Sequence, residues 1–484
     1  MSYTSWTYYV MIVGLLIIYY ILPKRIRWIC LFAGSIYFYK KLLVSREQLF
    51  IFALSVATSY LAGMMLEKIK NTDIKKRAIL IAGIVISVSP LLVEKLGQLI
   101  NGKPINNIGS FSFIVPVGLS FYSLQIIAYL VDIYKGKIEA QKNPLKYALF
   151  ITFFPQIIQG PIPRYGQIQS ELFDGNEYSF ENIVKGIQLV IWGLFLKFMI
   201  ADKAAIVVTP IFENYQGYSG FFLWVAAILY SFQLYTDFLS CTTLSIGVAN
   251  MFGIHLSSNF NHPYFSESIK EFWRRWHMSL SYWLRDYIYI PLGGSKNGRL
   301  KKWLNVIITF LISGLWHGGG WKFIIWGLLH GVYQIIGEIR FLVMKKMNIT
   351  RKEHQHDQIE RCIKKIGTFF LVMIGWVIFR AETLPDAIEM IKKMIRVINP
   401  WILFNDSLLG LGLGWKEWDV LFMSLLVLLF VSTAQEKGLI IREWICEQNI
   451  FIRFSIYLIA IWIIWIFGTY GYGYDARDFI YGGF

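Results

Sequence analysis

Charged residues are scarce in this sequence of 484 residues, because lysine, arginine, aspartate and glutamate together make up only 16% of it. A soluble domain carries about a quarter charged residues. By contrast, 56% of the residues are hydrophobic and 17% are aromatic. A water-soluble fold could not bury this much apolar surface. The composition therefore excludes an ordinary soluble protein and predicts one that is embedded in a membrane.

Several motifs of familiar chemistry are also missing. The four cysteines form no CxxC pair, so they predict neither a redox motif nor a zinc site. The sequence has no HExxH zinc helix, no GxxxxGKS/T phosphate loop, no GxSxG nucleophile elbow and no DxD pair. These absences argue against the zinc peptidases, P-loop enzymes, α/β-hydrolases and metal-dependent glycosyltransferases. We expect no metal site and no bound cofactor.

Long hydrophobic runs dominate what remains. Eleven blocks approach the length of about 20 residues that a helix needs to cross a hydrocarbon core about 30 Å thick. Lipid allows only helices or closed barrels to span it. We therefore expect an all-α polytopic membrane protein with about eleven transmembrane helices, together with re-entrant and interfacial helices. The blocks are Tyr8 to Leu22, Leu49 to Leu66, Ala78 to Val93, Ile114 to Val131, Ile183 to Ile200, Phe221 to Leu234, Trp303 to Trp316, Phe323 to Met344, Ile366 to Phe379, Val420 to Val431 and Phe451 to Phe467.

Basic residues outnumber acidic ones by 47 to 31, which gives a formal net charge of +16. Such an excess can indicate nucleic acid, but here the basic residues stand in short loops between the apolar blocks. This is the positive-inside pattern of membrane proteins. We expect a multi-pass protein of the cell membrane with these loops in the cytoplasm, the N-terminus outside and no nucleic-acid partner. Examples are Lys24, Arg25, Arg27, Lys68, Lys75, Lys76, Arg77, Lys345 and Lys346.

Polar features are distributed unevenly along the chain. We predict one membrane domain in three parts: N-terminal scaffold helices at 1–113, a catalytic core at 114–345 and C-terminal helices at 346–484. In the core, prolines, glycines, histidines and paired charges appear inside or beside apolar sequence. Polar groups at membrane depth are costly and usually functional, so we expect the chemistry in this part.

The stretch from Glu271 to Tyr287 is the first candidate for a functional site. Read as one helix, it has an apolar stripe, with Arg274 and Arg285 beside it. The stripe comprises Trp273, Trp276, His277, Leu280, Trp283, Leu284 and Tyr287. One interpretation is an interfacial anchor whose histidine is simply hydrogen-bonded. The other is the rim of a reaction chamber, where the two arginines hold an anionic group such as a cofactor phosphate.

His317 carries the strongest single signal. It follows the apolar block that ends at Trp316 and precedes three glycines at 318–320. Irregular backbone at membrane depth is tolerated only where protein or a water-filled cavity surrounds it. We predict a functional histidine here, against the alternative of a histidine that bridges two helices. His330, in the segment Trp326 to Gly331, is either a partner of His317 or a packing residue.

Acyl transfer would suit such histidines. A thioester is already activated, so the enzyme mainly has to deprotonate an acceptor hydroxyl and orient it. Histidine has a suitable pKa for a general base near neutral pH, and such a base contributes roughly 10²- to 10⁴-fold to the rate. No serine or cysteine nucleophile is needed, although a covalent intermediate stays open.

Long motifs along nearly the whole chain resemble the membrane-bound O-acyltransferase family, and within it the bacterial branch that contains the alginate O-acetylation protein. The motifs recur in order, which makes the resemblance specific. They are Pro116 to Tyr122, Asp132 to Tyr134, Phe154 to Arg164, Asn259 to Asn261, Phe272 to Gly294, Gly314 to Gly318, Trp326 to Gly331 and Gly375 to Ala381.

The resemblance implies a ring of helices around a central funnel, in which a cytoplasmic acyl donor meets an acceptor from outside. It implies that His317 is the main catalytic histidine and His277 the second catalytic position. It also implies acetyl-CoA as donor, a cell-envelope polysaccharide as acceptor and a separate extracytoplasmic transfer partner. We expect the substrate site to include Trp273, Arg274, Trp276, Arg285, Asn261 and His330. One departure is Thr243, which stands where relatives carry an acidic residue.

Two other functions stay open. A nearby branch of the family transfers D-alanine to teichoic acid. A transporter of lipid-linked sugars would also need many spans and intramembrane polar groups, but transporters often consist of two inverted halves. Here the unusual residues crowd into 115–330, without such symmetry.

Overall fold

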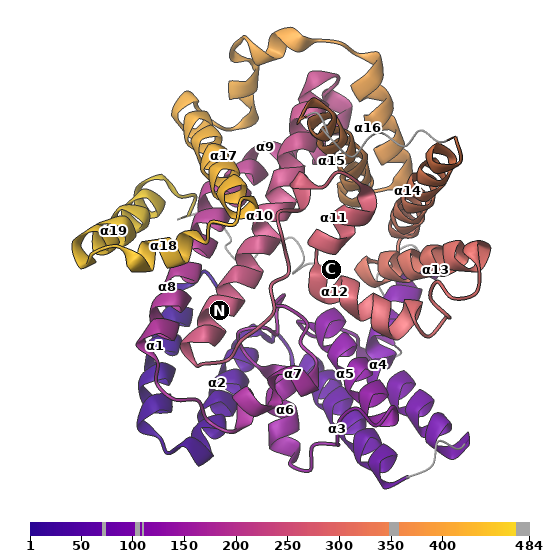
Figure 1. Ribbon diagram of the computed structural model, residues 1–484, viewed down its shortest axis with the longest axis vertical. Helices are drawn as coiled ribbons and strands as arrows, with labels where there is room; N and C mark the ends of the chain where they lie inside the picture. The colour runs from indigo at the N-terminus through magenta and orange to yellow at the C-terminus, as the bar shows by residue number, and fades with distance from the viewer. Residues whose placement is uncertain (70–73, 102–106, 109–110, 348–357, 471–484) are drawn as a thin grey trace. The chain divides into compact units, whose positions relative to one another are not determined.

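The computed structural model describes residues 1–69, 74–101, 107–108, 111–347 and 358–470. Most of the described chain is helical, as predicted (Figure 1). Its strands are two short segments, β1 (Asn107–Ile108) and β2 (Phe111–Ser112), which pair antiparallel with Asn107 opposite Ser112. The helices are α1 (Trp6–Ile21), α2 (Arg27–Leu42), α3 (Arg46–Lys68), α4 (Ile74–Asn101), α5 (Leu119–Tyr134), α6 (Pro144–Thr152), α7 (Tyr165–Phe173), α8 (Phe180–Phe195), α9 (Asp202–Glu213), α10 (Phe221–Met251), α11 (Ile269–Arg275), α12 (Met278–Leu284), α13 (Arg299–His317), α14 (Trp321–Lys346), α15 (Gln358–Arg380), α16 (Leu384–Arg396), α17 (Trp415–Glu436), α18 (Ile441–Glu447) and α19 (Ile450–Phe467).

Seven described helical segments are long and apolar enough to cross a membrane, which confirms a multi-pass membrane protein. They are α3, α4, the continuous stretch Phe180–Glu213, α10, α15, α17 and α19. Two further predicted blocks form the shorter apolar helices α1 and α5. The remaining two blocks, Trp303 to Trp316 and Phe323 to Met344, lie in α13 and α14. The apolar sequence of these helices is interrupted by residues such as Lys302, His330 and Glu338. The number of strongly apolar spans is therefore smaller than the number of hydrophobic blocks.

Helix packing divides the described chain into two compact units. The first contains residues 1–193 and 240–258, and the second contains 194–239 and 259–470. In the first unit, small residues let helices approach closely, as is common in membranes. A Cβ atom added to Gly83 of α4 would lie 2.6 Å from the Cβ atom of Ala62 on α3. A Cβ atom added to Gly63 of α3 would lie 2.9 Å from the Tyr129 ring on α5.

The second unit contains all three candidate histidines, and a pair of glycines sets the spacing of two of its helices. A Cβ atom at Gly314 of α13 would lie 2.2 Å from the carbonyl oxygen of Phe323 on α14. Reciprocally, a Cβ atom at Gly327 of α14 would lie 2.2 Å from the carbonyl oxygen of Phe310 on α13. Only glycine fits at either position, so the two helix backbones are in direct contact. This contact places His317 and His330 on adjoining helices.

Candidate active site

His277 lies at a break between two helices, which corrects the expectation of one continuous helix from Glu271 to Tyr287. Helix α11 ends at Arg275 and α12 begins at Met278. His277 itself has φ 44° and ψ 55°, the left-handed region that residues other than glycine rarely adopt. Such conformations persist only where the surrounding structure holds them, and they cluster at functional sites.

A neighbouring segment of the chain holds this break. The backbone N–H of Met278 donates to the carbonyl oxygen of Asn259 at 2.9 Å, and that of Ser279 donates to Asn259 Oδ1 at 3.2 Å. The N–H of Asn261 donates in turn to the carbonyl oxygen of Arg275 at 2.9 Å. Asn259 is buried, whereas the side chain of Asn261 is exposed. Of the motif Asn259 to Asn261, the predicted site includes only Asn261, whereas Asn259 is the residue that bonds to both Met278 and Ser279.

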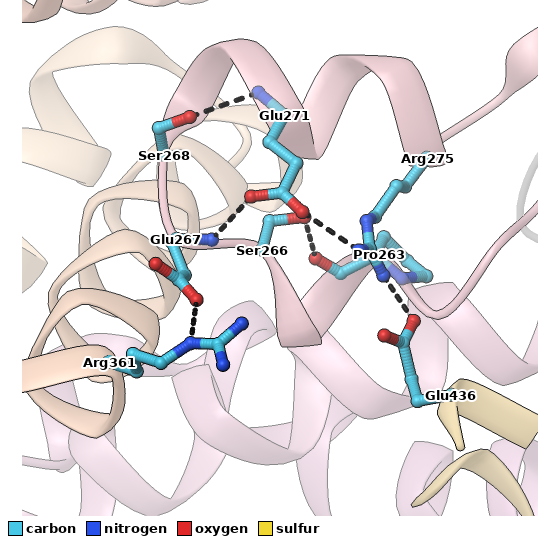
Figure 2. A network of polar contacts seen from close by, with 8 residues as sticks. All are labelled: Pro263, Ser266, Glu267, Ser268, Glu271, Arg275, Arg361 and Glu436. Atoms are coloured by element: carbon cyan, nitrogen blue, oxygen red, sulfur yellow. Dashed lines mark hydrogen bonds and ion pairs between the residues drawn. The ribbon is translucent and has the colours of Figure 1, made fainter. Parts of the chain in front are cut away.

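Ion pairs on the surface of the second unit hold the chain at both ends of α11 (Figure 2). The guanidinium of Arg275 pairs with Glu436 of α17 and, at 2.8 Å, with Oε1 of Glu271. Arg361 Nε of α15 donates to Glu267 Oε1 at 2.8 Å. Single surface ion pairs contribute little, but a network of several can hold a segment in place. Arg275, rather than its neighbour Arg274, is therefore the arginine that anchors this helix.

The His277 side chain is buried among aromatic rings. The Phe238 ring lies perpendicular to the imidazole at a centroid distance of 4.7 Å, and the Trp316 ring lies at 6.1 Å. Burial lowers the pKa of His277 from 6.5 to about 3, because an apolar environment disfavours the charged form. His277 is therefore a neutral imidazole at physiological pH.

His317 is the last residue of α13 and is also buried. Its ring lies 4.8 Å from Trp316, 5.2 Å from Trp326 and 5.3 Å from Phe379, measured between centroids. The following Gly318 has an extended backbone that any residue could adopt. Glycine is required there because an added Cβ atom would lie 2.1 Å from the Phe323 ring. Gly318 thus serves close packing against Phe323. Both His317 and His277 contact the ring of Trp316.

His330 is buried on α14 and contacts the same tryptophan as His317. Its ring lies 5.0 Å from Trp326, and its Nδ1 accepts a hydrogen bond from the Trp273 indole N–H at 3.3 Å. This bond favours the neutral form that carries its proton on Nε2. A Cβ atom at Gly375 would lie 2.6 Å from that Nε2. Trp273 is thus a partner of His330.

The remaining predicted site residues divide into buried and exposed groups. Trp276 is fully buried, with ring centroids 5.0 Å from Phe260 and 4.9 Å from Trp376. Arg274 and Arg285 are exposed, and Arg285 Nε donates to Asp286 Oδ1 at 2.8 Å. The structure therefore gathers His277, His317, His330, Trp273 and Trp276 in one aromatic core, and places Arg274, Arg285 and Asn261 at the surface of the unit.

A buried charge cluster next to this core was not anticipated. Lys197 Nζ lies 2.7 Å from Asp237 Oδ1 and 2.9 Å from Asp202 Oδ1, and all three side chains are nearly inaccessible. Lys197 belongs to a π-helical turn at Leu196–Ala201, a feature frequent at functional sites. Asp237 immediately precedes Phe238, which packs against His277. Charges at this depth are stable only when paired, so the cluster locks α10 against the middle of the preceding span, Phe180–Glu213.

No group of three or more histidine, cysteine, aspartate or glutamate residues in the described ranges is arranged to hold a metal ion. The chemistry that the described core offers is that of neutral imidazoles in an apolar, aromatic surrounding. Such groups can transfer a proton to or from a reacting group, and they can position that group by a hydrogen bond.

Comparison with known proteins agrees with this chemistry. The model of the membrane-bound O-acyltransferase family matches residues 136–377. The probable alginate O-acetylase of Azotobacter vinelandii is 33% identical over 385 residues, covering 78% of this chain and 74% of that protein. The peptidoglycan O-acetyltransferase of Helicobacter pylori is 35% identical over 371 residues, 70% of this chain and 69% of that protein.

A more distant relative is the teichoic acid D-alanyltransferase of Bacillus subtilis, which is 27% identical over 315 residues, 62% of this chain and 77% of that protein. The matched residues 136–377 contain the break at His277, the end of α13 and the Trp326 cluster. The resemblance seen in the sequence motifs is thereby confirmed. This chain belongs to the membrane-bound O-acyltransferase family.

Proposed function

We propose that this membrane enzyme transfers an acetyl group from a thioester donor, acetyl-CoA, to or towards hydroxyl groups of a cell-envelope polysaccharide. The observation that carries the proposal is the meeting of His277 and His317 at the Trp316 ring in a buried aromatic core. Alginate and peptidoglycan O-acetylases among the relatives support a polysaccharide acceptor. An extracytoplasmic partner protein that completes the transfer is part of the proposal.

In the proposed reaction His317 acts as the general base. Its imidazole takes the proton of an acceptor hydroxyl while the hydroxyl oxygen attacks the thioester carbonyl. The tetrahedral intermediate then expels the thiolate, which receives the proton from the imidazolium of His317. The products are the O-acetyl ester and the free thiol, and the base is restored. General-base catalysis of this kind contributes roughly 10²- to 10⁴-fold.

We assign His277 a different role. Its lowered pKa keeps the ring neutral, so it can donate one N–H hydrogen bond without carrying charge. A donor directed at the oxygen that becomes negative in the transition state stabilises it. We therefore propose that His277 orients the thioester carbonyl or the acceptor hydroxyl. Trp273, Trp276 and His330 would support these two histidines from within the aromatic core.

The first prediction concerns His317→Ala. We expect this variant to lose nearly all acetate that mild base releases from purified envelope polysaccharide, because the proton acceptor is gone. The measurement compares cells that carry intact or variant protein at equal membrane levels. His255→Ala is the matched control, because His255 is an exposed histidine of the first unit that bonds to Glu171. Unchanged acetate in His317→Ala would overturn the role of this histidine.

D-alanyl transfer is the second candidate, and the Bacillus subtilis relative supports it. The same base and the same ester chemistry would serve a D-alanyl thioester. The two candidates differ in the ester that His317→Ala abolishes. Loss of acetate supports O-acetylation, whereas loss of D-alanine esters with acetate unchanged supports the second candidate. Transport of a lipid-linked sugar would leave both esters in place.

A further inference from the structure

Two cationic side chains lie beside the histidine core without being used by the reaction above. Lys322 stands in the first turn of α14 and Arg380 is the last residue of α15. Lys322 Nζ donates to the carbonyl oxygen of Ala381, the residue after Arg380, at 2.6 Å. This bond places the start of α14, which carries Lys322, beside the end of α15, which carries Arg380. Within the described ranges, neither side chain forms an ion pair.

Both cations flank an aromatic pair that leads to His317. Phe323 follows Lys322 and Phe379 precedes Arg380, and their ring centroids are 5.2 Å apart. The Phe379 ring lies 5.3 Å from the imidazole of His317. Arg380 is therefore adjacent in the chain to a ring that contacts His317. Lys322 is adjacent to the Phe323 ring, which packs against Gly318. A group bound between them would lie close to the candidate catalytic base.

A buried hydroxyl, that of Tyr230, lies within electrostatic range of Arg380. The centroid of the Phe212 ring lies 5.8 Å from the Arg380 guanidinium and 5.5 Å from the centroid of the Tyr230 ring. Tyr230 is completely buried, and its hydroxyl has no hydrogen-bond partner among the described residues. Buried hydroxyls are nearly always satisfied, so an unsatisfied one calls for an explanation. Tyr230 is available to donate to a bound acceptor oxygen.

The charge balance at this place favours a negative ligand. Burial and the neighbouring Arg380 lower the pKa of Lys322 to about 8, and Glu382 opposes both. Glu382 is exposed, so it is a weak neutraliser for a half-buried lysine and arginine. An anion placed between the two cations would raise the pKa of Lys322 back towards its usual value. Arginine and lysine are the side chains that proteins use to bind phosphate and carboxylate groups.

We propose that Lys322, Arg380 and the Tyr230 hydroxyl form an anion-binding site that holds a phosphate or carboxylate group of one of the two substrates next to His317. The proposal rests on the proposed acyl transfer for its substrates. The anion is either a phosphate of the acyl donor or a carboxylate of an acidic polysaccharide. It takes the role that the sequence had suggested for Arg274 and Arg285.

The test is the protection of Lys322 from an amine-reactive reagent at pH 8, measured by mass spectrometry on the purified full-length protein. Four probes are compared at constant ionic strength: coenzyme A, pantetheine without phosphate, D-glucuronate and D-glucose. We expect one anionic probe, but not its neutral counterpart, to slow labelling about tenfold, as a contribution near 1.4 kcal/mol would. Lys302, which pairs with Glu338 at 2.7 Å, is the internal control.

Protection by coenzyme A alone identifies the donor phosphate as the ligand, and protection by glucuronate alone identifies the acceptor carboxylate. Arg380→Gln should abolish the protection and Arg380→Lys should retain most of it. Equal labelling with all four probes would overturn the proposal. The readout does not require acetyl transfer, so protection of Lys322 with unaffected acetate in His317→Ala would reject the proposed function and keep the site.

A kinetic arm uses Lys322→Gln, because glutamine can still donate to the Ala381 carbonyl while it lacks the charge. We expect the KM for the anionic substrate to rise about tenfold, with kcat little changed. A fall in kcat at unchanged KM would contradict a binding role.

Discussion

At the scale of single residues, the core depends on imidazoles whose protonation the surroundings restrict. His277 is kept neutral by burial in a left-handed turn. His330 Nδ1 accepts a hydrogen bond from the Trp273 N–H, and His330 Nε2 packs against Gly375, where a side chain would collide with it. These restraints give two histidines a defined state before any substrate binds. Preorganised groups of this kind need no rearrangement at the moment of reaction.

The restraint on His277 predicts how stability depends on pH. Its pKa falls from 6.5 to about 3 on folding, so below pH 6.5 the unfolded chain binds a proton that the folded chain does not. The stabilising contribution is present above pH 6.5 and is lost progressively towards pH 3. Where His277 is protonated in the unfolded chain but not in the folded chain, the free energy of unfolding falls by about 1.4 kcal/mol for each pH unit of acidification. Thermal unfolding in detergent should show it.

The control is His277→Asn, since asparagine tolerates the left-handed backbone and does not titrate here. Between pH 6.5 and 5 the unfolding midpoint of the intact protein should fall further than that of the variant. Parallel curves would mean that His277 is reached by water and protonated in the folded state.

At the scale of helices, the direct contact of α13 and α14 connects the histidines. Gly314 and Gly327 face each other's helix so closely that neither has room for a methyl group. His317 follows Gly314 by three residues and His330 follows Gly327 by three residues, so this contact holds the two histidines on adjoining helices. Helix association in membranes relies on such packing, because lipid is as apolar as the side chains.

Gly327→Ala should therefore damage both stability and acetylation, because the added methyl group meets the backbone of Phe310. The expected cost is about 1 to 3 kcal/mol, typical of overpacking. Gly337→Ala on the same helix is the matched control, since nothing lies within 4 Å of an added Cβ atom there. That variant should gain up to about 1 kcal/mol from helix propensity. Equal unfolding midpoints and equal polysaccharide acetate in the two variants would refute the contact.

At the scale of the whole molecule, hydropathy sets the number of membrane crossings. Seven helical segments are clearly long enough, whereas α1 has 16 residues. At 1.5 Å per residue α1 is about 24 Å long, slightly less than a hydrocarbon core of about 30 Å. Basic residues cluster right after it, at Lys24, Arg25 and Arg27. By the positive-inside rule these mark the cytoplasmic side.

We therefore predict that α1 crosses the membrane with its N-terminus outside. Trp6→Cys and Lys24→Cys place a thiol at an exposed position on either side of α1. In intact cells a membrane-impermeant thiol reagent should label the first variant and label the second only after permeabilisation. Protein without either substitution is the control, since it has four native cysteines. Labelling of both variants from the same side would show that α1 does not span.

The sequence by itself determined the class of protein, most of its helices, its family and the position of His317, because hydrophobic length, glycine and motif order are local properties. Only the tertiary structure decided the break at His277, the Lys197 charge cluster and the pairing of Trp273 with His330. Each of these joins residues far apart in the chain: Asn259 bonds across to Met278, Asp237 pairs with Lys197, and α11 meets α14. A pattern of polar and apolar residues predicts which face of a helix is buried. It does not predict which partner a buried polar group finds, because that depends on packing in three dimensions.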